Sequence, residues 1–283
     1  MSKVKVFTDS AADLPQEMLE RYDIGVVPIL VTFPDRSYAD GVELSASEFY
    51  RLMDDSPKLP ITSQPSPHDF VQAFSPFLEA SLAIVSVNLS SGLSGTVESA
   101  LLAKDTLGDK ARELHIVDSQ AASMGQGALV LLAAYLAEQG RSAKEIVQAV
   151  QAARQKLVHL FTLDTMENMV KGGRVSRAKG TLGDLLNIKP ILFLDDAGKI
   201  DLLDKVRGRK KSLKYLLDSY TSHAKPSGYP YLGISHADSL EEAREVAEQM
   251  QTLQPDTPVV IGTIGAAIGT HTGRGCIAIF YFQ

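Results

Sequence analysis

Residues 83–96 read AIVSVNLSSGLSGT and join an apolar strand pattern to a polar loop. The apolar run at 83–85 passes into serines and glycines, and a helical pattern begins at Thr96. A strand that leads through a loop into a helix is the building unit of α/β folds. The start of such a helix has free backbone N–H groups and the positive end of the helix dipole, so it suits a carboxylate or a phosphate.

This loop contains no lysine or arginine, so a bound anion would be met mainly by hydrogen bonds. An ordinary helix cap would explain the hydroxyl groups without a ligand. Similar loops recur along the chain, and this recurrence favours a binding site.

The composition is that of a globular protein with one large or two ordinary domains. Of 283 residues, 45% are hydrophobic and 22% are charged, and the net charge of −6 argues against a general nucleic-acid binder. The single cysteine, Cys276, excludes an internal disulfide and a cysteine-rich metal site, which fits a reducing compartment. Residues 1–6 lead straight into a strand, and the apolar run 127–137 is too short to span a bilayer. We expect a soluble, cytoplasmic protein.

The first part of the chain alternates strand and helix patterns, which indicates a mostly parallel, doubly wound sheet. Pro28 favours an edge position for the second strand, and residues 57–67 are expected to form a proline-rich loop. The expected strands are 4–7, 26–31, 81–87 and 114–117, and the expected helices are 14–22, 47–53, 67–77, 96–107, 125–138 and 143–156.

After about Val158 the pattern changes to hairpins mixed with helices. Residues 190–194 and 200–203 are apolar and are separated by Asp195–Gly198, which predicts a hairpin. Further strands are expected at 229–235, 259–264 and 277–282, and helices at 165–170, 177–186, 211–223 and 240–250. We therefore predict an N-terminal α/β domain over 1–158 and a C-terminal α+β domain with a mixed sheet over 159–283.

Small polar residues follow the predicted strands, at the sheet edge where open α/β folds bind ligands. The sequence Ser66-Pro67-His68-Asp69 predicts a capping box, which explains Ser66 but leaves Thr62 and Ser63 without a structural role. The other loops are Thr8–Ser10, Asn88–Thr96, Asp118–Ser119 and, from the second domain, the glycine-flanked segment Ile268–Gly275 around His271.

Several standard sites are absent from the sequence. It has neither a G-x-x-x-x-G-K-[ST] phosphate loop nor a G-x-G-x-x-G turn after the first strand, and its histidines show no paired spacing for a metal. Gly92-Leu93-Ser94-Gly95 falls short of a nucleophile elbow. A hydrolase triad of Ser94, His271 and Asp118 stays open as an alternative.

Taken together, the polar motifs resemble the DegV family in order and spacing over essentially the whole chain. The matching segments are Phe7–Ser10 with Asp13–Pro15, Thr62–Pro67, Leu93–Thr96, Val117–Ser119, Gly172–Ser176, Ile188–Leu192 and Ile268–Gly273. The resemblance implies a two-domain fold that holds a long-chain fatty acid, such as palmitate or oleate, between the domains. It also implies a separate kinase subunit that phosphorylates the carboxylate, with no catalytic residue in this chain.

The same resemblance implies that Thr62 and Ser94 bind the carboxylate, with His271 nearby, and we include the neighbours Ser63 and Gly95 in the expected site. The chain departs from the family pattern at Ala266-Ala267 and at Arg274, where prolines are commoner, and Arg274 would add a charge near the head group.

The chemistry of a fatty acid agrees with these residues. Burying about fourteen methylenes at ~0.8 kcal/mol each gives roughly 11 kcal/mol before the costs of binding, so the apolar chain should dominate affinity. Neutral donors suit a carboxylate that is about to be phosphorylated, because an arginine clamp would stabilise the ground state. Residues 129–136 and 26–31 are candidates for the slot, although core packing explains them as well.

One strong basic cluster, residues 205–211 with Lys214, interrupts an otherwise acidic chain. A solvated helix start would explain it, and a docking surface for an acidic partner is the functional interpretation. We predict Arg207, Arg209 and Arg174 on that surface. A peripheral membrane contact is possible for the exchange of lipid. A small-metabolite or phosphate-binding domain is a third interpretation of the chain's function.

Overall fold

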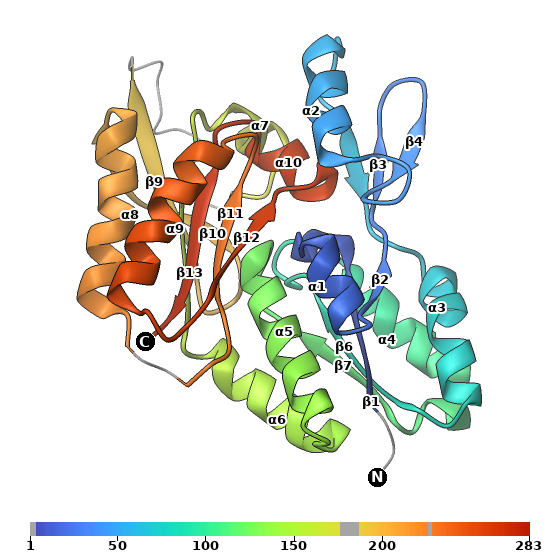
Figure 1. Cartoon of the computed structure of the whole chain (residues 1–283). Coiled ribbons are helices and arrows are strands. Elements are labelled where there is room, and N and C mark those ends of the chain that lie inside the picture. Colours follow the sequence, from blue (N-terminus) through green and yellow to red (C-terminus); the bar gives the residue numbers. More distant parts are fainter. Residues whose placement is uncertain (1–3, 176–186, 226–227) are drawn as a thin grey trace.

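The computed structural model describes residues 4–175, 187–225 and 228–283 of the chain (Figure 1). Its first sheet is parallel throughout, in the order β2-β1-β6-β7. Its strands are β1 (Val4–Asp9), β2 (Gly25–Val27), β6 (Ala83–Asn88) and β7 (Leu114–Asp118). Every residue of β6 is buried, as expected for a strand covered on both faces.

Helices cover both faces of this sheet, so the predicted doubly wound arrangement is confirmed. Phe7 and Ile84 face one core with Phe70 and Phe74, whereas their neighbours along the strands face the other core. The helices on the first face are α3 (Pro67–Glu79) and α4 (Thr96–Leu107), and those on the second are α5 (Met124–Glu138) and α6 (Ala143–Arg154). The predicted capping box at Ser66 opens α3.

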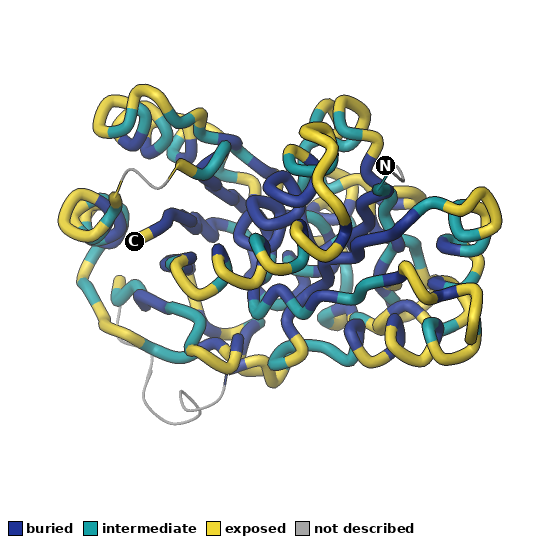
Figure 2. The backbone as a smooth tube through the Cα atoms, turned by 90° about the horizontal axis from the view of Figure 1, so that it is seen from below, coloured by how far each residue is buried: buried dark blue, intermediate teal, exposed yellow. Residues whose placement is uncertain are grey.

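The second sheet is mixed, in the order β10-β9-β8-β13-β11-β12, and only β11 and β12 are parallel. The strands are β8 (Leu157–Thr162), β9 (Ile188–Leu194), β10 (Ile200–Arg207), β11 (Leu232–His236), β12 (Val259–Thr263) and β13 (Ile277–Phe282). Helices α8 (Arg209–His223) and α9 (Leu240–Leu253) pack on this sheet, and α5 packs on it as well. Helix α5 thus lies between the two sheets (Figure 1), where its residues 124–134 are all buried. Figure 2 shows the buried backbone gathered in the interior of the molecule, with exposed segments around it.

A small antiparallel sheet projects from the first half and reaches the second. It consists of β3 (Leu30–Thr32), β4 (Ser37–Ala39) and β5 (Ile61–Ser63), in the order β4-β3-β5, with α2 (Ala46–Asp55) beside it. Helix α10 (Ala266–Thr272) contacts α2, β3, β5 and α7 (Glu167–Lys171). The short elements α1 (Gln16–Arg21), η1 (Ser10–Ala12) and η2 (Gly108–Ala111) complete the described chain.

Four local predictions were wrong. The single strand over 26–31 is divided at Pro28, which lacks an N–H donor, so β2 and β3 belong to different sheets. The loop over 57–67 contains β5, and residues 157–162, for which no strand was predicted, form β8 inside the second sheet. Residues 266–272, expected as loop, form α10. The helix predicted over 177–186 lies outside the described residues.

Candidate functional site

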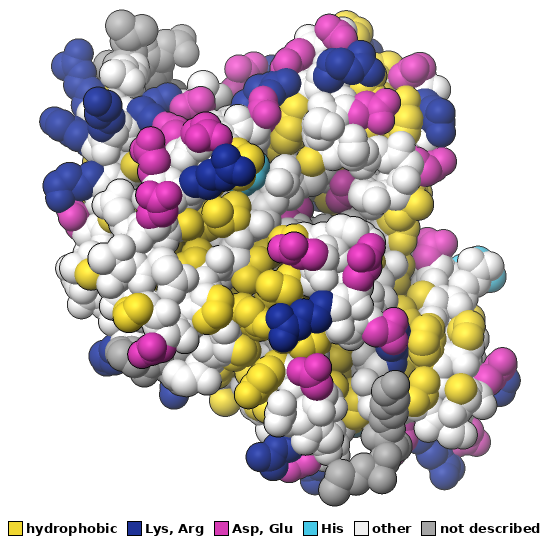
Figure 3. Space-filling view, viewed as in Figure 1, with side chains coloured by type: hydrophobic (Ala, Val, Ile, Leu, Met, Phe, Trp, Pro, Cys, Tyr) yellow, Lys and Arg dark blue, Asp and Glu magenta, His cyan; other side chains and the backbone are white. Residues whose placement is uncertain are grey.

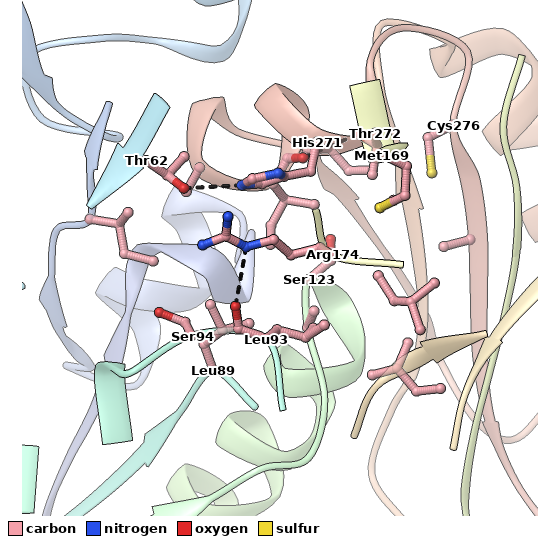
Figure 4. Close-up of a pocket in the computed structure, with 18 of the residues that line it drawn as sticks. Thr62, Leu89, Leu93, Ser94, Ser123, Met169, Arg174, His271, Thr272 and Cys276 are labelled. Carbon is pink, nitrogen blue, oxygen red and sulfur yellow. Dashed lines mark hydrogen bonds between the residues drawn. The ribbon is translucent and has the colours of Figure 1, made fainter. Parts of the chain in front are cut away.

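The centre of the site is a hydrogen bond between β5 and α10. Thr62 Oγ1 lies 3.0 Å from His271 Nε2 (Figure 4). Because side chains alternate along a strand, Thr62 points inward while its neighbours Ile61 and Ser63 are exposed. Helix α10 supplies His271 from its last turn, so the two predicted residues meet although they come from distant parts of the chain.

The Ser94 loop forms a second wall. The backbone N–H groups of Leu93 and Ser94 both donate to Ser90 O, at 3.0 and 3.1 Å, and Ser94 Oγ lies 2.9 Å from Thr96 Oγ1. A Cβ atom at Gly95 would collide with the side-chain amide of Gln64, which donates to Ser99 Oγ at 3.0 Å. Glycine at this position therefore lets the β5 segment pack against the start of α4.

These residues share one cavity of about 380 Å³ between the two halves. Thr62, Ser63, Ser94, Gly95 and His271 all line it, so the structure brings the whole predicted set together. The remaining wall is largely apolar and comes from both halves: Ile29, Leu89, Leu93, Ala122, Phe161, Met169, Leu194, Ile200, Ile264, Ala267, Ile268, Cys276, Ala278 and Phe280. Residues 129–136 do not line it, whereas Ile29 of the other candidate segment does.

Sequence reasoning missed most of the apolar wall. Cys276, Ala278 and Phe280 alternate at the start of and along β13, and Phe161 pairs across from Ala278 on β8. The available signal was the alternation of Cys276, Ala278 and Phe280 with two isoleucines, but such an apolar strand is equally typical of a packed core.

Arg174 also lines the cavity, a position that the sequence did not predict, and its part in partner docking stays a prediction. It is exposed, donates from Nη1 to Gly172 O at 2.8 Å, and lies with Nε 3.4 Å from Leu93 O (Figure 4). The cavity entrance therefore has a cation, although the Ser94 loop itself contains none.

His271 is neutral at physiological pH. Burial, and then the positive charge of Arg174, lower its pKa from 6.5 to about 4. Its Nδ1 atom is buried and has no hydrogen-bond partner among the described residues. A neutral imidazole can donate through one ring nitrogen and accept through the other, so it can bind an oxygen without a fixed charge.

The geometry contradicts the hydrolase triad. Asp118 accepts from Ser91 Oγ at 2.5 Å and from the backbone N–H of Gln120 at 2.9 Å. Ser94 is paired with Thr96, and His271 with Thr62. Neither the nucleophile–base pair nor the base–carboxylate pair of a triad is formed.

The basic cluster gathers over the start of α8, at the upper left of Figure 3. Arg207 is exposed at the end of β10, but Arg209 is only 19% exposed and binds Glu242 at 2.6 Å. The charge of Arg209 is therefore already paired within the protein, and its part in docking stays a prediction. Arg274 binds Asp54 and Asp238 and does not line the cavity, so it adds no charge to the cavity wall.

Two classes of site are not found in the described parts of the chain. Residues 4–175, 187–225 and 228–283 contain no group of three or more histidine, cysteine or acidic side chains placed to hold a metal. None of the helices described over these ranges has the length and apolar character needed to cross a membrane.

Comparisons with known proteins identify the architecture. Residues 3–283 match the family model described as an uncharacterised protein of the DegV family. A DegV domain-containing protein of Clostridium perfringens is 37% identical, covering 99% of this chain and 98% of that protein.

Solved structures agree with the sequence comparison. DegV from Bacillus subtilis, described as a fatty-acid-binding protein, is 32% identical with a TM-score of 0.86 and full coverage of both chains. A stearic-acid-binding protein from Eubacterium ventriosum is 26% identical with a TM-score of 0.89, covering 100% of this chain and 98% of that one. With the predicted fold and motifs in place along its length, the chain belongs to the DegV family.

Proposed function

We propose that this protein binds a long-chain fatty acid in the cavity between its halves. The observation that carries the proposal is that one cavity combines hydroxyl and imidazole groups with a largely apolar wall. In the proposed complex, Thr62, Ser94 and His271 bind the carboxylate, and the acyl chain lies along Phe161, Ala278 and Phe280. The descriptions of the B. subtilis and E. ventriosum proteins support the same ligand class.

We further propose that the protein is a carrier that presents the carboxylate to a separate kinase. Thr62, Ser94 and His271 are neutral donors for the carboxylate, Arg174 is the cation among the described lining residues, and these residues form no activated nucleophile. Arg174 is exposed at the entrance, where it could contact an approaching acyl phosphate or its phosphate donor. A nucleotide-dependent kinase partner would place the protein in the cytoplasm.

The ligand class is tested by mass spectrometry of an organic extract of the purified protein, followed by calorimetric titration with oleate. We expect a co-purifying long-chain acid and saturable one-to-one binding after delipidation. Absence of both would refute the proposal. An esterase assay tests the hydrolase alternative. Esterase activity that the wild type has and Ser94→Ala lacks would support the hydrolase.

A further inference from the structure

Helix α10 lacks an N-terminal cap of its own. Its N-cap residue is Gly265, which has no side chain to accept from the first-turn amides. Two carboxylates from the first half of the chain accept instead. Gly265 N donates to Asp13 Oδ1 at 2.8 Å, and Ala266 N donates to Asp40 Oδ1 at 2.9 Å.

Both carboxylates are buried where the two halves meet. Asp13 is 8% exposed and Asp40 is 3% exposed. The second oxygen of Asp13 accepts from Ser123 Oγ, which lines the cavity and lies 2.7 Å from Ser235 Oγ on β11. Ser10 donates to Asp40 as well. The pair therefore connects η1, β4, α5 and β11 to the start of α10.

Burial of two carboxylates costs stability. Desolvation is the largest cause that raises the pKa of both Asp13 and Asp40, and their mutual repulsion raises the pKa of Asp13 further. Apolar side chains of similar volume would avoid this cost. The hydrogen bonds that the carboxylates accept from the start of α10 offset part of this desolvation cost.

The position of α10 decides the geometry of the polar end of the cavity. The helix contributes Ala267, Ile268, His271 and Thr272 to the wall, and the Thr62–His271 hydrogen bond spans only 3.0 Å. Fewer than two helical turns separate Gly265 from His271, so a displacement of the helix start would also shift His271. Its packing against α2 is close as well, since a Cβ at Gly269 would collide with Phe49 and Tyr50.

We propose that Asp13 and Asp40 are positioning residues. They hold the start of α10 in the place that keeps His271 within hydrogen-bond distance of Thr62. Neither aspartate is part of the wall of this cavity. The inference rests on the proposed function only for its effect on affinity, because the His271–Thr62 geometry exists in the protein without ligand.

The test compares Asp13→Ala and Asp40→Ala with Glu145→Ala. Glu145 also caps a helix start, accepting from Ser142 N at 2.9 Å, but it is exposed and remote from the cavity. His271 is titrated by NMR in the delipidated proteins, and oleate affinity is measured by calorimetry. We expect both alanine variants to raise the pKa of His271 from about 4 towards 6.5 and to weaken oleate binding at least tenfold. The Glu145 control should change neither quantity.

Conservative variants separate positioning from folding. Asp13→Asn keeps an oxygen for Gly265 N and an amide that can donate to Ser123 Oγ, so it should restore the His271 titration. Asp40→Asn likewise keeps an oxygen for Ala266 N, so it should also retain the titration. Asp13→Leu and Asp40→Leu remove both acceptor oxygens at similar volume and without a buried charge, so they should fold and shift the titration even if the alanine variants do not fold. Unchanged His271 titration in the folded leucine variants would overturn the inference. Failure of the wild type to bind oleate would refute the proposed function instead.

Discussion

His271 Nε2 and Thr62 Oγ1 lie 3.0 Å apart although 209 residues separate them in the sequence. The contact joins the last turn of α10 to the middle of β5, so it links the projecting sheet of the first half to the second half. When His271 donates from Nε2 to Thr62 Oγ1, the threonine hydroxyl remains free to donate to a carboxylate. The contact keeps both side chains oriented before a ligand arrives. Preorganisation of this kind lowers the entropic cost of binding.

Thr62→Ala and Ser94→Ala should each weaken oleate binding without unfolding the protein. Each removes a hydrogen bond to a charged group, with an expected cost on the order of 1.5–3 kcal/mol. Isothermal titration calorimetry measures the loss, and circular dichroism checks the fold. Thr32→Ala is the matched control, because Thr32 bonds Ser37 at 2.8 Å in the same small sheet but does not line the cavity. Full affinity in both site variants would place the head group elsewhere.

Ligand binding should raise the pKa of His271. In the free protein, burial and Arg174 lower that pKa to about 4, below the value of 6.5 expected in the unfolded chain. The free protein therefore loses stability as pH falls from 6.5 towards 4, because the unfolded state binds more protons. A bound carboxylate favours the imidazolium, so the linked gain in affinity is present at lower pH and is lost as pH rises through the bound-state pKa.

NMR titration of His271 with and without oleate measures this shift directly. His271→Ala should weaken binding and flatten its pH dependence. Identical pKa values in the two states would remove His271 from the carboxylate site.

Ala278→Phe should shorten the acyl chain that the protein accepts. Ala278 lies on β13 between Cys276 and Phe280, and all three line the cavity. A phenyl ring there would fill space that we assign to methylenes, each of which contributes ~0.8 kcal/mol when buried. Competition between dodecanoic acid and stearic acid is the measurement, with the shorter acid gaining relative affinity. Equal losses for the two acids would argue that the chain takes another path.

Arg209→Met should destabilise the fold, whereas Arg207→Met should not. Arg209 is mostly buried and makes a bidentate pair with Glu242, with distances from Arg209 Nε and Nη2 of 3.0 and 2.6 Å. Loss of this pair leaves a partly buried carboxylate, at a cost of about 2 kcal/mol. Urea unfolding, followed by circular dichroism, compares the stability of the two variants. Equal unfolding midpoints would show that the Arg209–Glu242 pair does not stabilise the fold.

Arg207→Glu should leave oleate affinity intact and lower acyl-phosphate formation with a partner kinase. Arg207 is exposed at the end of β10 and does not line the cavity. Lys225→Glu is a charge-matched control beyond the opposite end of α8, where it is also exposed. Salt should weaken the wild-type activity more than that of Arg207→Glu, because the variant lacks one attractive charge. Equal kinase-coupled rates in both variants would indicate that the cluster is only solvated.

Much of the fold was predictable because its signals are local. The helix over 96–107 was predicted with its observed bounds, and the strand–helix alternation gave the correct class of sheet. The small sheet was missed because its three-residue strands rely on pairing between segments distant in sequence, such as Val31 with Thr62. No local pattern specifies such a pairing.

The candidate site was likewise predictable only where its signals are local. Its polar residues occupy loops and helix starts with recognisable motifs, as at Ser94 and Thr62. Its apolar wall consists of residues such as Ile200 and Phe280, whose character is the same in a core and beside a cavity. Arg174 lies at the cavity entrance because of the tertiary arrangement, which the sequence of its own turn does not indicate.

Helix α5 has a consequence for the way the molecule opens. Its side chains pack against β1 and β6 of the first sheet and against β11 and β13 of the second, so one continuous core includes both sheets. The two halves therefore cannot swing apart about a hinge without exposing this helix to water, at a large hydrophobic cost. Entry of the proposed fatty acid would instead use smaller displacements at the periphery, such as tilting of the small β3–β5 sheet relative to α10. The buried helix α5 thus stabilises the fold, while exchange of the proposed lipid would be confined to the periphery of the cavity.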